Sequence, residues 1–266
     1  MKALILAGGR GTRLGALTAD RPKPMLPIGG APMLERIMGG IASQTPIRDF
    51  VLVTGYRADV IQDYFGDGSG WGWQIEYVAQ PVPKGVGDAV HCARLALQDT
   101  VFLMTYGDIM LAPSNYGRFV SEYDAKRPPN PNSGEPETLV PLELGARGRS
   151  AMLVGLNWVE DPCQGAAVYL NAQSNIERIE EKPAPGTAQT HWNNAGLFVF
   201  PPLLFDYTAR LTPSARGEYE LPDAISAMIR DGHAARGLPL EGPWRDVGTP
   251  DDYAAINREF EQEHAK

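Results

Sequence analysis

The chain has few of the residues that define several common classes of protein. It contains only two cysteines in 266 residues, without Cys-x-x-Cys spacing, so we expect reduced thiols in the cytoplasm and no disulfide framework. Its four histidines are scattered, which argues against a zinc cluster. No apolar run approaches the roughly 20 residues of a membrane span. Only a handful of apolar residues follow Met1 and Lys2 before a glycine, so we expect no signal peptide and no membrane partner.

Positive charge is also scarce. The 24 lysines and arginines are outnumbered by 32 acidic residues, the formal net charge is -8, and no basic run occurs. This balance argues against nucleic acid and anionic membrane surfaces as partners. An acidic protein that binds phosphate groups must do so with a few local cations, and the N-terminal region has them.

Short apolar segments alternate with amphipathic ones through the first half of the chain. Strands are expected at residues 2–7, 49–54, 74–79 and 101–105, and helices at residues 32–42, 58–65 and 88–97. The first strand is apolar throughout after Lys2, as expected of a strand covered on both faces. This alternation predicts an α/β protein with a Rossmann-like sheet, mixed but mainly parallel, flanked by helices.

The second half contains more strands and fewer helices. A proline-rich polar loop spans 128–136, and strands are expected at 138–144, 152–159, 166–171, 175–180 and 196–200. A helix is expected at 221–230, and a terminal helix has Thr249 as its cap and Pro250 as its first residue. We expect a single domain, 1–266, in which the halves 1–127 and 137–250 precede a C-terminal helix at 251–266.

Residues 6–28, LAGGRGTRLGALTADRPKPMLPI, follow the first strand and combine glycines with two kinds of cation. The dinucleotide pattern Gly-x-Gly-x-x-Gly fails because Leu14 stands at its sixth position, and no Gly-Lys-Ser/Thr completes a P-loop. The physics of a phosphate site is still present. Glycine N–H groups can approach anionic oxygens closely. Arg13 can bind a phosphate with two parallel hydrogen bonds. The prolines on both sides of Lys23 restrict its backbone. The alternative is a surface turn with two solvated cations.

The same stretch closely resembles the signature of the sugar-nucleotide pyrophosphorylases, nucleotidyltransferases that join a nucleoside triphosphate to a sugar 1-phosphate. Ala16 departs from the family pattern, which usually has proline there. Six later stretches also match the family in order: QPVPKGVGDAV, YGD, EEKP, NNAG, GEYEL and WRDVGTP. The resemblance covers nearly the whole chain and implies the nucleotide-diphospho-sugar transferase fold. It places the nucleotide in the first half of the chain and the sugar phosphate in the second.

The resemblance also implies a reaction and the residues of the nucleotide site. A phosphate oxygen of the sugar 1-phosphate would displace pyrophosphate in line, so the barrier is largely electrostatic and positional. Arg13 and Lys23 would hold the triphosphate and the leaving pyrophosphate, and with Asp108 they are the expected catalytic residues. The residues expected to bind the nucleotide are Leu6, Ala7, Gly8, Gly9, Gly11, Thr12, Arg13, Lys23, Gln80 and Gly85.

Two aspartates are expected to share a magnesium ion. Asp108 ends YGD, just beyond the carboxyl end of a predicted parallel strand, where open α/β sheets bind ligands. Asp246 lies in WRDVG, far away in sequence, and the resemblance implies that both carboxylates contact the same Mg²⁺. This ion prefers one or two carboxylates together with phosphate oxygens and water, so a pair is sufficient. The alternatives are a turn residue for Asp108 and a helix cap or ion-pair partner for Asp246.

The base is predicted from hydrogen-bonding groups. Uracil and thymine present an N3–H donor beside a carbonyl acceptor, and the amide of Gln80 offers one acceptor and one donor. The segment QPVPKGVGDAV resembles the family's pyrimidine-binding segment, with Gly85 approaching the base. The segment's Gly-x-Gly-x-Ala-Val form resembles uridylyl members more than thymidylyl ones, so UTP is expected first and dTTP second. Guanine would favour a carboxylate in this position. The alternative for Gln80 is an exposed amide at a strand end.

The resemblance assigns the sugar phosphate to EEKP and NNAG. Glu181 would accept hydrogen bonds from sugar hydroxyls, Lys182 would meet the phosphate, and Asn194 would reach another hydroxyl. Gly165 would let the backbone approach the sugar ring. Glucose 1-phosphate is the expected substrate, and N-acetylglucosamine and other sugars are the alternatives, because the contacts that distinguish them are too fine to predict from the sequence. The alternative for residues 180–182 is a solvated run of charges at a strand end.

Two other classes of protein share parts of this pattern. A non-catalytic sugar-nucleotide sensor of the same fold would lack a cation or a metal carboxylate, but Arg13, Lys23, Asp108 and Asp246 are all present. A glycosyltransferase would carry Asp-x-Asp after the strand, where GDIM has a single aspartate. Guanylyl- and cytidylyl-specific relatives are alternatives in specificity, and the sequence is compatible with a homo-oligomer.

Overall fold

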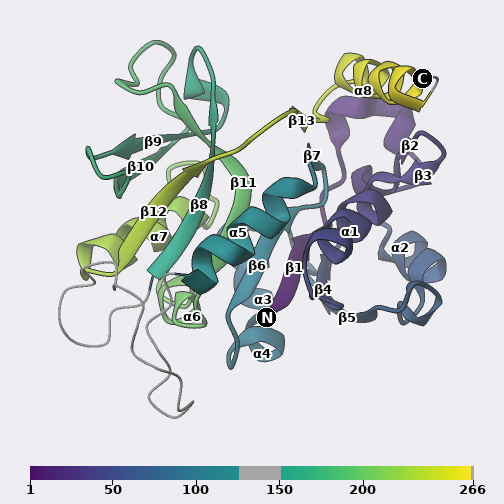
Figure 1. Ribbon diagram of the computed structural model, residues 1–266, viewed down its shortest axis with the longest axis horizontal. Coiled ribbons are helices and arrows are strands. Elements are labelled where there is room, and N and C mark those ends of the chain that lie inside the picture. Colours follow the sequence, from purple (N-terminus) through teal and green to yellow (C-terminus); the bar gives the residue numbers. More distant parts are fainter. Residues whose placement is uncertain (126–150, 265–266) are drawn as a thin grey trace.

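One central sheet connects both halves of the chain in the computed structural model, which describes residues 1–125 and 151–264. Its strands follow the order β10-β9-β11-β6-β1-β4-β5, and β8 pairs with both β11 and β12 (Figure 1). The strands are β1 (Lys2–Leu6), β4 (Asp49–Thr54), β5 (Gln74–Ala79), β6 (Phe102–Tyr106), β8 (Ala151–Trp158), β9 (Ala166–Leu170), β10 (Ile176–Glu181), β11 (Trp192–Phe200) and β12 (Ala234–Pro239).

Strand direction differs between the two halves of the chain. β1 lies between β4 and β6 and is parallel to both, and β5 is parallel to β4. In the second half, β11 runs antiparallel to β6, β8 and β9, while β12 is parallel to β8. The parallel strands are joined through helices because a parallel connection must cross the sheet. The predicted α/β fold with a mixed sheet is therefore confirmed.

Helices cover both faces of the sheet (Figure 1). The side chains of α1 (Met33–Gln44) and α5 (Ser114–Ala125) pack on the face that contains Ala3 and Ile5, and Ile256 of α8 (Pro250–His264) joins the same apolar cluster away from the sheet. Those of α3 (Val86–Cys92), α6 (Leu204–Thr208) and α7 (Leu221–Arg230) pack on the opposite face, with Leu4. Successive residues of a strand point to opposite faces, which explains why β1 is apolar at consecutive positions. None of the helices in the described ranges has the length and apolar composition needed to cross a membrane.

The expected helices form with small changes at their ends. The predicted helix 88–97 divides into α3 and α4 (Arg94–Leu97) at Ala93, whose φ and ψ of -80° and 4° leave the helical region. The predicted cap of α8 is confirmed, since Thr249 Oγ1 accepts the Asp252 N–H and the Asp252 carboxylate accepts the Thr249 N–H. The helix 58–65 is α2 (Ala58–Phe65). The proline-rich loop 128–136 and the strand 138–144 lie outside the described residues.

Two short antiparallel ribbons were not predicted from the sequence. β2 (Pro27–Ile28) pairs with β3 (Ala31–Pro32), and β7 (Ile109–Leu111) pairs with β13 (Trp244–Asp246). A three-residue strand carries too little periodicity to be recognised in isolation. The β7–β13 ribbon joins the segment after β6 to a segment close to the C-terminal helix, so it determines which distant residues become neighbours.

Candidate active site

Functional candidates from distant parts of the sequence meet where the parallel strands β1, β5 and β6 end. Residues 7–9 follow β1, Gln80 follows β5, and Asp108 lies just beyond β6. The backbone connects two of these segments, because the Gly107 N–H donates to the Leu6 carbonyl at 2.9 Å. Open α/β sheets bind ligands at this edge. The fold therefore gathers these candidates at the position where such sheets bind their substrates.

Lys23 bridges two carboxylates at this edge. Its Nζ lies 2.6 Å from Oδ2 of Asp108 and 3.2 Å from Oδ1 of Asp246. The lysine side chain is 7% exposed, whereas those of the two aspartates are 36% and 44% exposed. A buried ammonium needs charged partners, and the aspartates keep free surface for a ligand. We call Lys23, Asp108 and Asp246 the charged triad.

The β7–β13 ribbon brings the two aspartates together. Asp246 is the last residue of β13 and pairs with Ile109, the first residue of β7. The Val247 N–H donates to the Asp108 carbonyl at 3.3 Å and extends the ribbon to the second aspartate. Two carboxylates that contact one ammonium can also hold a divalent cation together with phosphate oxygens. Among the described residues, no group of three or more His, Cys, Asp and Glu side chains could hold a metal ion.

Gly11 leaves the space that Lys23 occupies. Its φ is +70°, and a Cβ at this position would lie 2.9 Å from Cβ of Lys23, a contact that requires one backbone to shift. Gly15, in the same turn, also has a positive φ of +57°, but a Cβ there would meet nothing within 4 Å. An alanine at either position would therefore be strained by the positive φ, but only an alanine at residue 11 would also contact Lys23.

Sequence reasoning makes Lys23 a catalytic residue, and on that expectation Gly11→Ala should lower turnover about 10- to 100-fold, because displacing such a group by about 1 Å can lose this much rate. Gly15→Ala should keep turnover near that of the wild type. Both variants should lose stability: Gly11→Ala by about 1–2 kcal/mol at its left-handed φ and ψ of 70° and 45°, and Gly15→Ala by about 1–3 kcal/mol at 57° and -122°, a region that L-residues avoid. The rate per folded molecule, measured beside Tm for both variants, separates the two effects. Equal rates in the two variants would show that the contact with Lys23 is irrelevant.

A first cavity, of about 290 Å³, opens beside the charged triad. Of the residues expected to bind the nucleotide, Leu6, Gly8, Gly9, Lys23, Gln80 and Gly85 line it together with Asp108. Ala7, Gly11, Thr12 and Arg13 do not, and Arg13 lines a second cavity instead. Gly85 has a φ of +108°, and a Cβ there would lie 2.7 Å from the carbonyl oxygen of Tyr219. A side chain at this position would therefore push away the loop that precedes α7.

Gln80 lines the first cavity with its amide already oriented. Its Nε2 donates to Oδ2 of Asp88 at 2.8 Å and to the carbonyl oxygen of Gly85 at 3.3 Å. Both amide protons are thus used within the protein, and the amide oxygen is the group left for a ligand. This differs from the expectation that the amide would offer a base one donor and one acceptor.

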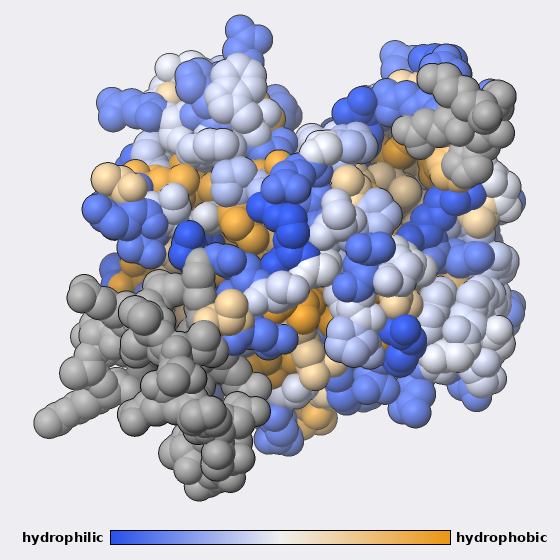
Figure 2. Space-filling view, in the orientation of Figure 1, coloured by the Kyte–Doolittle hydropathy of each residue, from blue (hydrophilic) through white to orange (hydrophobic). Residues whose placement is uncertain are grey.

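A second cavity, of about 580 Å³, adjoins the first, and Lys23 and Asp108 line both. The other predicted site residues that line it are Arg13, Gly165, Glu181, Lys182, Asn194 and Asp246. The β9–β10 region and the start of α8 contribute to its opposite sides, and Figure 2 shows the surface hollowed between these two parts. All the residues that sequence reasoning placed beside the sugar phosphate therefore share one cavity.

The backbone around the second cavity is specialised. Lys182 has a φ of 44°, in the left-handed region that costs an L-residue about 1 kcal/mol, and its N–H donates to the Gly165 carbonyl at 2.7 Å. A Cβ on Gly165 would collide with the amide of Asn193, whose Oδ1 accepts the Ala166 N–H at 3.0 Å. The glycine is therefore needed for the packing of Asn193, a reason that the sequence did not suggest.

Sequence reasoning missed Arg216, which lies just before the GEYEL stretch. Its Nη2 is 2.7 Å from Oε1 of Glu220 and 3.3 Å from Oε1 of Glu181. Burial raises the pKa of the Glu181 carboxyl, the nearby Glu220 carboxylate raises it further, and the Arg216 guanidinium opposes both effects. Arg216 therefore helps to keep Glu181 ionised as a hydrogen-bond acceptor. The one feature of the sequence that could have indicated Arg216 is its position directly before GEYEL, a stretch that matches the family.

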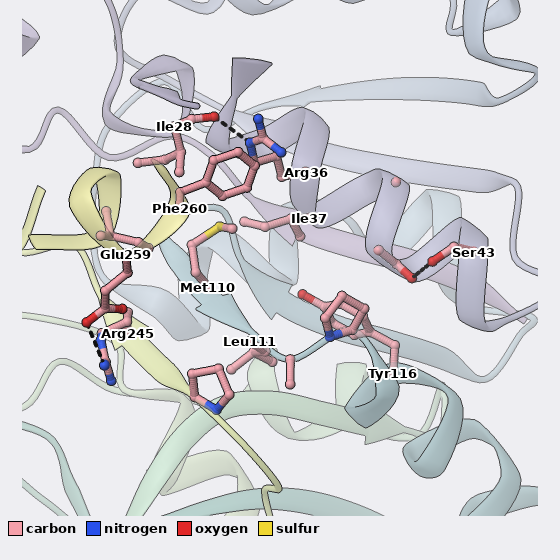
Figure 3. A pocket seen from close by; sticks show the side chains of 16 residues that line it. Ile28, Arg36, Ile37, Ser43, Met110, Leu111, Tyr116, Arg245, Glu259 and Phe260 are labelled. Atoms are coloured by element: carbon pink, nitrogen blue, oxygen red, sulfur yellow. Dashed lines mark hydrogen bonds and ion pairs between the residues drawn. The ribbon is translucent and has the colours of Figure 1, made fainter. Parts of the chain in front are cut away.

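A third cavity, of about 430 Å³, lies among α1, β7, β13 and α8 (Figure 3). The guanidinium of Arg36 lies over the ring of Phe260, 3.9 Å from its centroid. Arg245 lines this cavity, while its neighbours Trp244 and Asp246 line the second one, as side chains that alternate along β13 would. The third cavity shares no lining residue with the other two and is separate from the charged triad.

Comparisons with known proteins match nearly the whole chain. The family model described as "Nucleotidyl transferase" matches residues 2–129 and 145–263. A low-salt glycan biosynthesis nucleotidyltransferase of Haloferax volcanii is 31% identical over 259 residues, which are 97% of this chain and 65% of that protein. A glucose-1-phosphate thymidylyltransferase of Streptomyces griseus is 31% identical over 258 residues, again 97% of this chain and 65% of that protein.

The match extends to the fold. The crystal structure of a UDP-glucose pyrophosphorylase complexed with UDP-glucose has a TM-score of 0.81 to this chain, covers 98% of each chain and is 20% identical. At this identity the likeness shows the fold, and the fold expected from the opening stretch is confirmed. The chain spans 54% to 65% of the length of the curated relatives that it matches.

Proposed function

We propose, since the chain belongs to the nucleotidyl transferase family, that it joins a nucleoside triphosphate to a sugar 1-phosphate and releases pyrophosphate. The family match agrees with the family that the quoted stretches of sequence resemble. The observation that carries the proposal is the position of Lys23 and Asp108, which line two adjoining cavities at once. Two compartments that meet at one charged centre suit a reaction between two bound anions.

We assign the first cavity to the nucleoside and the second to the sugar phosphate. Gln80 and Gly85 line the first cavity and offer polar groups to a base. Glu181, Lys182 and Asn194 line the second and offer a carboxylate, an ammonium and an amide to a phosphorylated sugar. In this arrangement the α-phosphorus of the nucleotide lies close to the charged triad, between the two substrates.

The reaction is a single displacement at phosphorus. An oxygen of the sugar phosphate forms a bond to the α-phosphorus, and the bond between that phosphorus and the oxygen bridging to the β-phosphate breaks. The bonding electrons leave with pyrophosphate, so no covalent enzyme intermediate is needed. The two reactants repel each other, and catalysis must therefore supply positioning and positive charge. Lys23 supplies a compact charge at the junction, and Arg13, which lines the second cavity, can hold phosphate oxygens bidentately.

The two aspartates of the charged triad fit a magnesium ion. Both contact one cation already, both keep exposed surface, and their number is what Mg²⁺ uses beside phosphate oxygens. When bound there, the ion would polarise phosphate oxygens and offset developing charge. Lys23 would then turn from the carboxylates toward the phosphates, which its flexible stem allows.

The choice of nucleotide and sugar is the finer part of the proposal. UTP and dTTP are favoured, because both present an N3–H that the oxygen of Gln80 can accept. UTP is placed first because the form Gly-x-Gly-x-Ala-Val at residues 85–90 resembles uridylyl members of the family. The name of the Streptomyces relative specifies thymidylyl transfer, and that of the solved neighbour specifies UDP-glucose. The relative's name supports a pyrimidine nucleotide and glucose 1-phosphate as substrates of this chain, and the neighbour's name agrees with it, although at 20% identity that likeness shows the fold alone.

Release of pyrophosphate tests the proposed function directly. The protein is incubated with Mg²⁺, each of UTP, dTTP, CTP, GTP and ATP, and a panel of sugar 1-phosphates. We expect release with UTP or dTTP and glucose 1-phosphate, and none when the sugar phosphate is omitted. No release with any pair, combined with binding of a finished UDP-sugar, would indicate a sensor of the same fold.

A further inference from the structure

Asp88 fixes which way the amide of Gln80 faces. Asp88 lies in the first turn of α3, is half-buried, and accepts the hydrogen bond from Nε2 of Gln80. The second neighbour of the same nitrogen is the Gly85 carbonyl. A carboxylate and a carbonyl can only accept hydrogen bonds, so the amide group that faces them must be the NH₂. The orientation therefore follows from the chemistry of the two neighbours.

In this orientation Gln80 offers a base only a hydrogen-bond acceptor, its amide oxygen. Both protons of the amide are engaged, and the oxygen has no protein partner among the described residues, while Gln80 lines the first cavity. Uracil and thymine carry a proton on N3 that this oxygen can accept. Cytosine carries a lone pair on N3, which would face the oxygen as a second acceptor. Turning the amide over would place the Gln80 oxygen against the Asp88 carboxylate.

We propose that Asp88 is a specificity-determining residue that makes Gln80 an obligate acceptor, so that the first cavity selects pyrimidines protonated at N3 and rejects cytosine. This inference rests on the assignment of the first cavity to the nucleoside. Asp88 does not line either cavity of the site, and it acts through Gln80. It is therefore a positioning residue rather than a catalytic one.

A merely structural role for Asp88 predicts a different result. An acidic residue in the first turn of a helix also interacts with the helix dipole, and losing that interaction would weaken all nucleotides alike. Asparagine keeps the size of Asp88 but can donate as well as accept. In Asp88→Asn the carboxylate at 2.8 Å no longer excludes the turned amide, and only the more distant Gly85 carbonyl, at 3.3 Å, still opposes it. Both amide orientations then become accessible, and the turned one presents its NH₂ to the cavity, where it suits N3 of cytosine. Only the specificity role changes the ratio between two nucleotides.

The experiment compares kcat/KM for UTP, dTTP and CTP at a fixed concentration of Mg²⁺ and glucose 1-phosphate. In Asp88→Asn we expect the ratio of UTP to CTP to fall about tenfold or more, as expected when one hydrogen bond stops discriminating. The ratio of UTP to dTTP should stay unchanged, because both bases present the same edge. The control is Asp99→Asn, an exposed aspartate just after α4 that loses the same charge; both ratios should match those of the wild type.

Binding of UMP and CMP, measured by titration calorimetry, gives a second readout that does not need turnover. A preference for UMP that falls in Asp88→Asn supports the inference even if the wild type transfers no nucleotide, which would count against the proposed function alone. An unchanged ratio in both readouts overturns the inference. So does a wild type that prefers GTP and loses it in Asp88→Asn, because the carboxylate would then face the base itself.

Discussion

Replacing Lys23 with alanine should lower turnover by about 10²- to 10³-fold, the loss expected when one pre-positioned group that stabilises transition-state charge is removed. The side chain of Lys23 is 7% exposed and its Nζ contacts both Asp108 and Asp246, so no solvent cation replaces it easily. The fold should persist, since both aspartates keep contact with water. The measurement is the initial rate of pyrophosphate release, with a circular dichroism spectrum and Tm to verify folding.

The matched control is Arg21→Ala. Arg21 also carries a positive charge in the opening loop, but its side chain is 42% exposed and its Nε pairs with Oδ1 of the neighbouring Asp20 at 3.1 Å. This variant should retain turnover close to that of the wild type, so that a loss in Lys23→Ala cannot be ascribed to net charge. A rate near normal in Lys23→Ala would place the chemistry away from the charged triad.

Asp108→Asn and Asp246→Asn should each lower turnover by about 10³-fold at physiological Mg²⁺, because each removes a carboxylate from a site whose ion supplies several kcal/mol. Both residues contact the Nζ of Lys23, and we propose that both contact the same ion. Raising the concentration of Mg²⁺ should restore part of the rate in each variant. The rate is followed as a function of Mg²⁺ concentration.

The double variant decides whether the two aspartates act together. Residues that act as one unit lose little more together than singly, so the double variant should be only slightly slower than the slower single variant. Asp251→Asn, an exposed aspartate in the first turn of α8, controls for the loss of a carboxylate close by. Fully multiplicative losses in the double variant would show that Asp108 and Asp246 hold separate partners.

Several elements of the fold could be predicted because their pattern is local. The apolar run of β1 and the amphipathic pattern of α1 identified a buried strand and a covering helix. The cap of α8 was readable from Thr249 and Pro250, because capping involves neighbours in the sequence. The break at Ala93 was not readable, since the flanking residues 88–97 have helical periodicity on both sides. The division of one domain into halves at 127 and 137 stays a prediction.

The candidate site was predictable only as a set of separate pieces. Arg13, Lys23 and Gln80 were each recognisable from residue type and from the matching stretches of sequence. The contact of Arg216 with Glu181 was not, because it joins a loop to the end of a distant strand. Gln80 and Asp88 are close in sequence, but whether the oxygen or the NH₂ of the Gln80 amide faces the cavity depends on side-chain geometry. Neither contact leaves a periodic signal.

The sequence by itself determined the class of fold and the family, because these depend on local hydrophobic period and on motifs read in order; the binding of phosphate by the opening loop stays a prediction. Only the tertiary structure decided that Lys23 lies between Asp108 and Asp246 and that two cavities meet there. That arrangement depends on the pairing of β7 with β13, two three-residue strands far apart in the chain. Long-range pairing follows from how the whole chain packs, which no short stretch of sequence encodes.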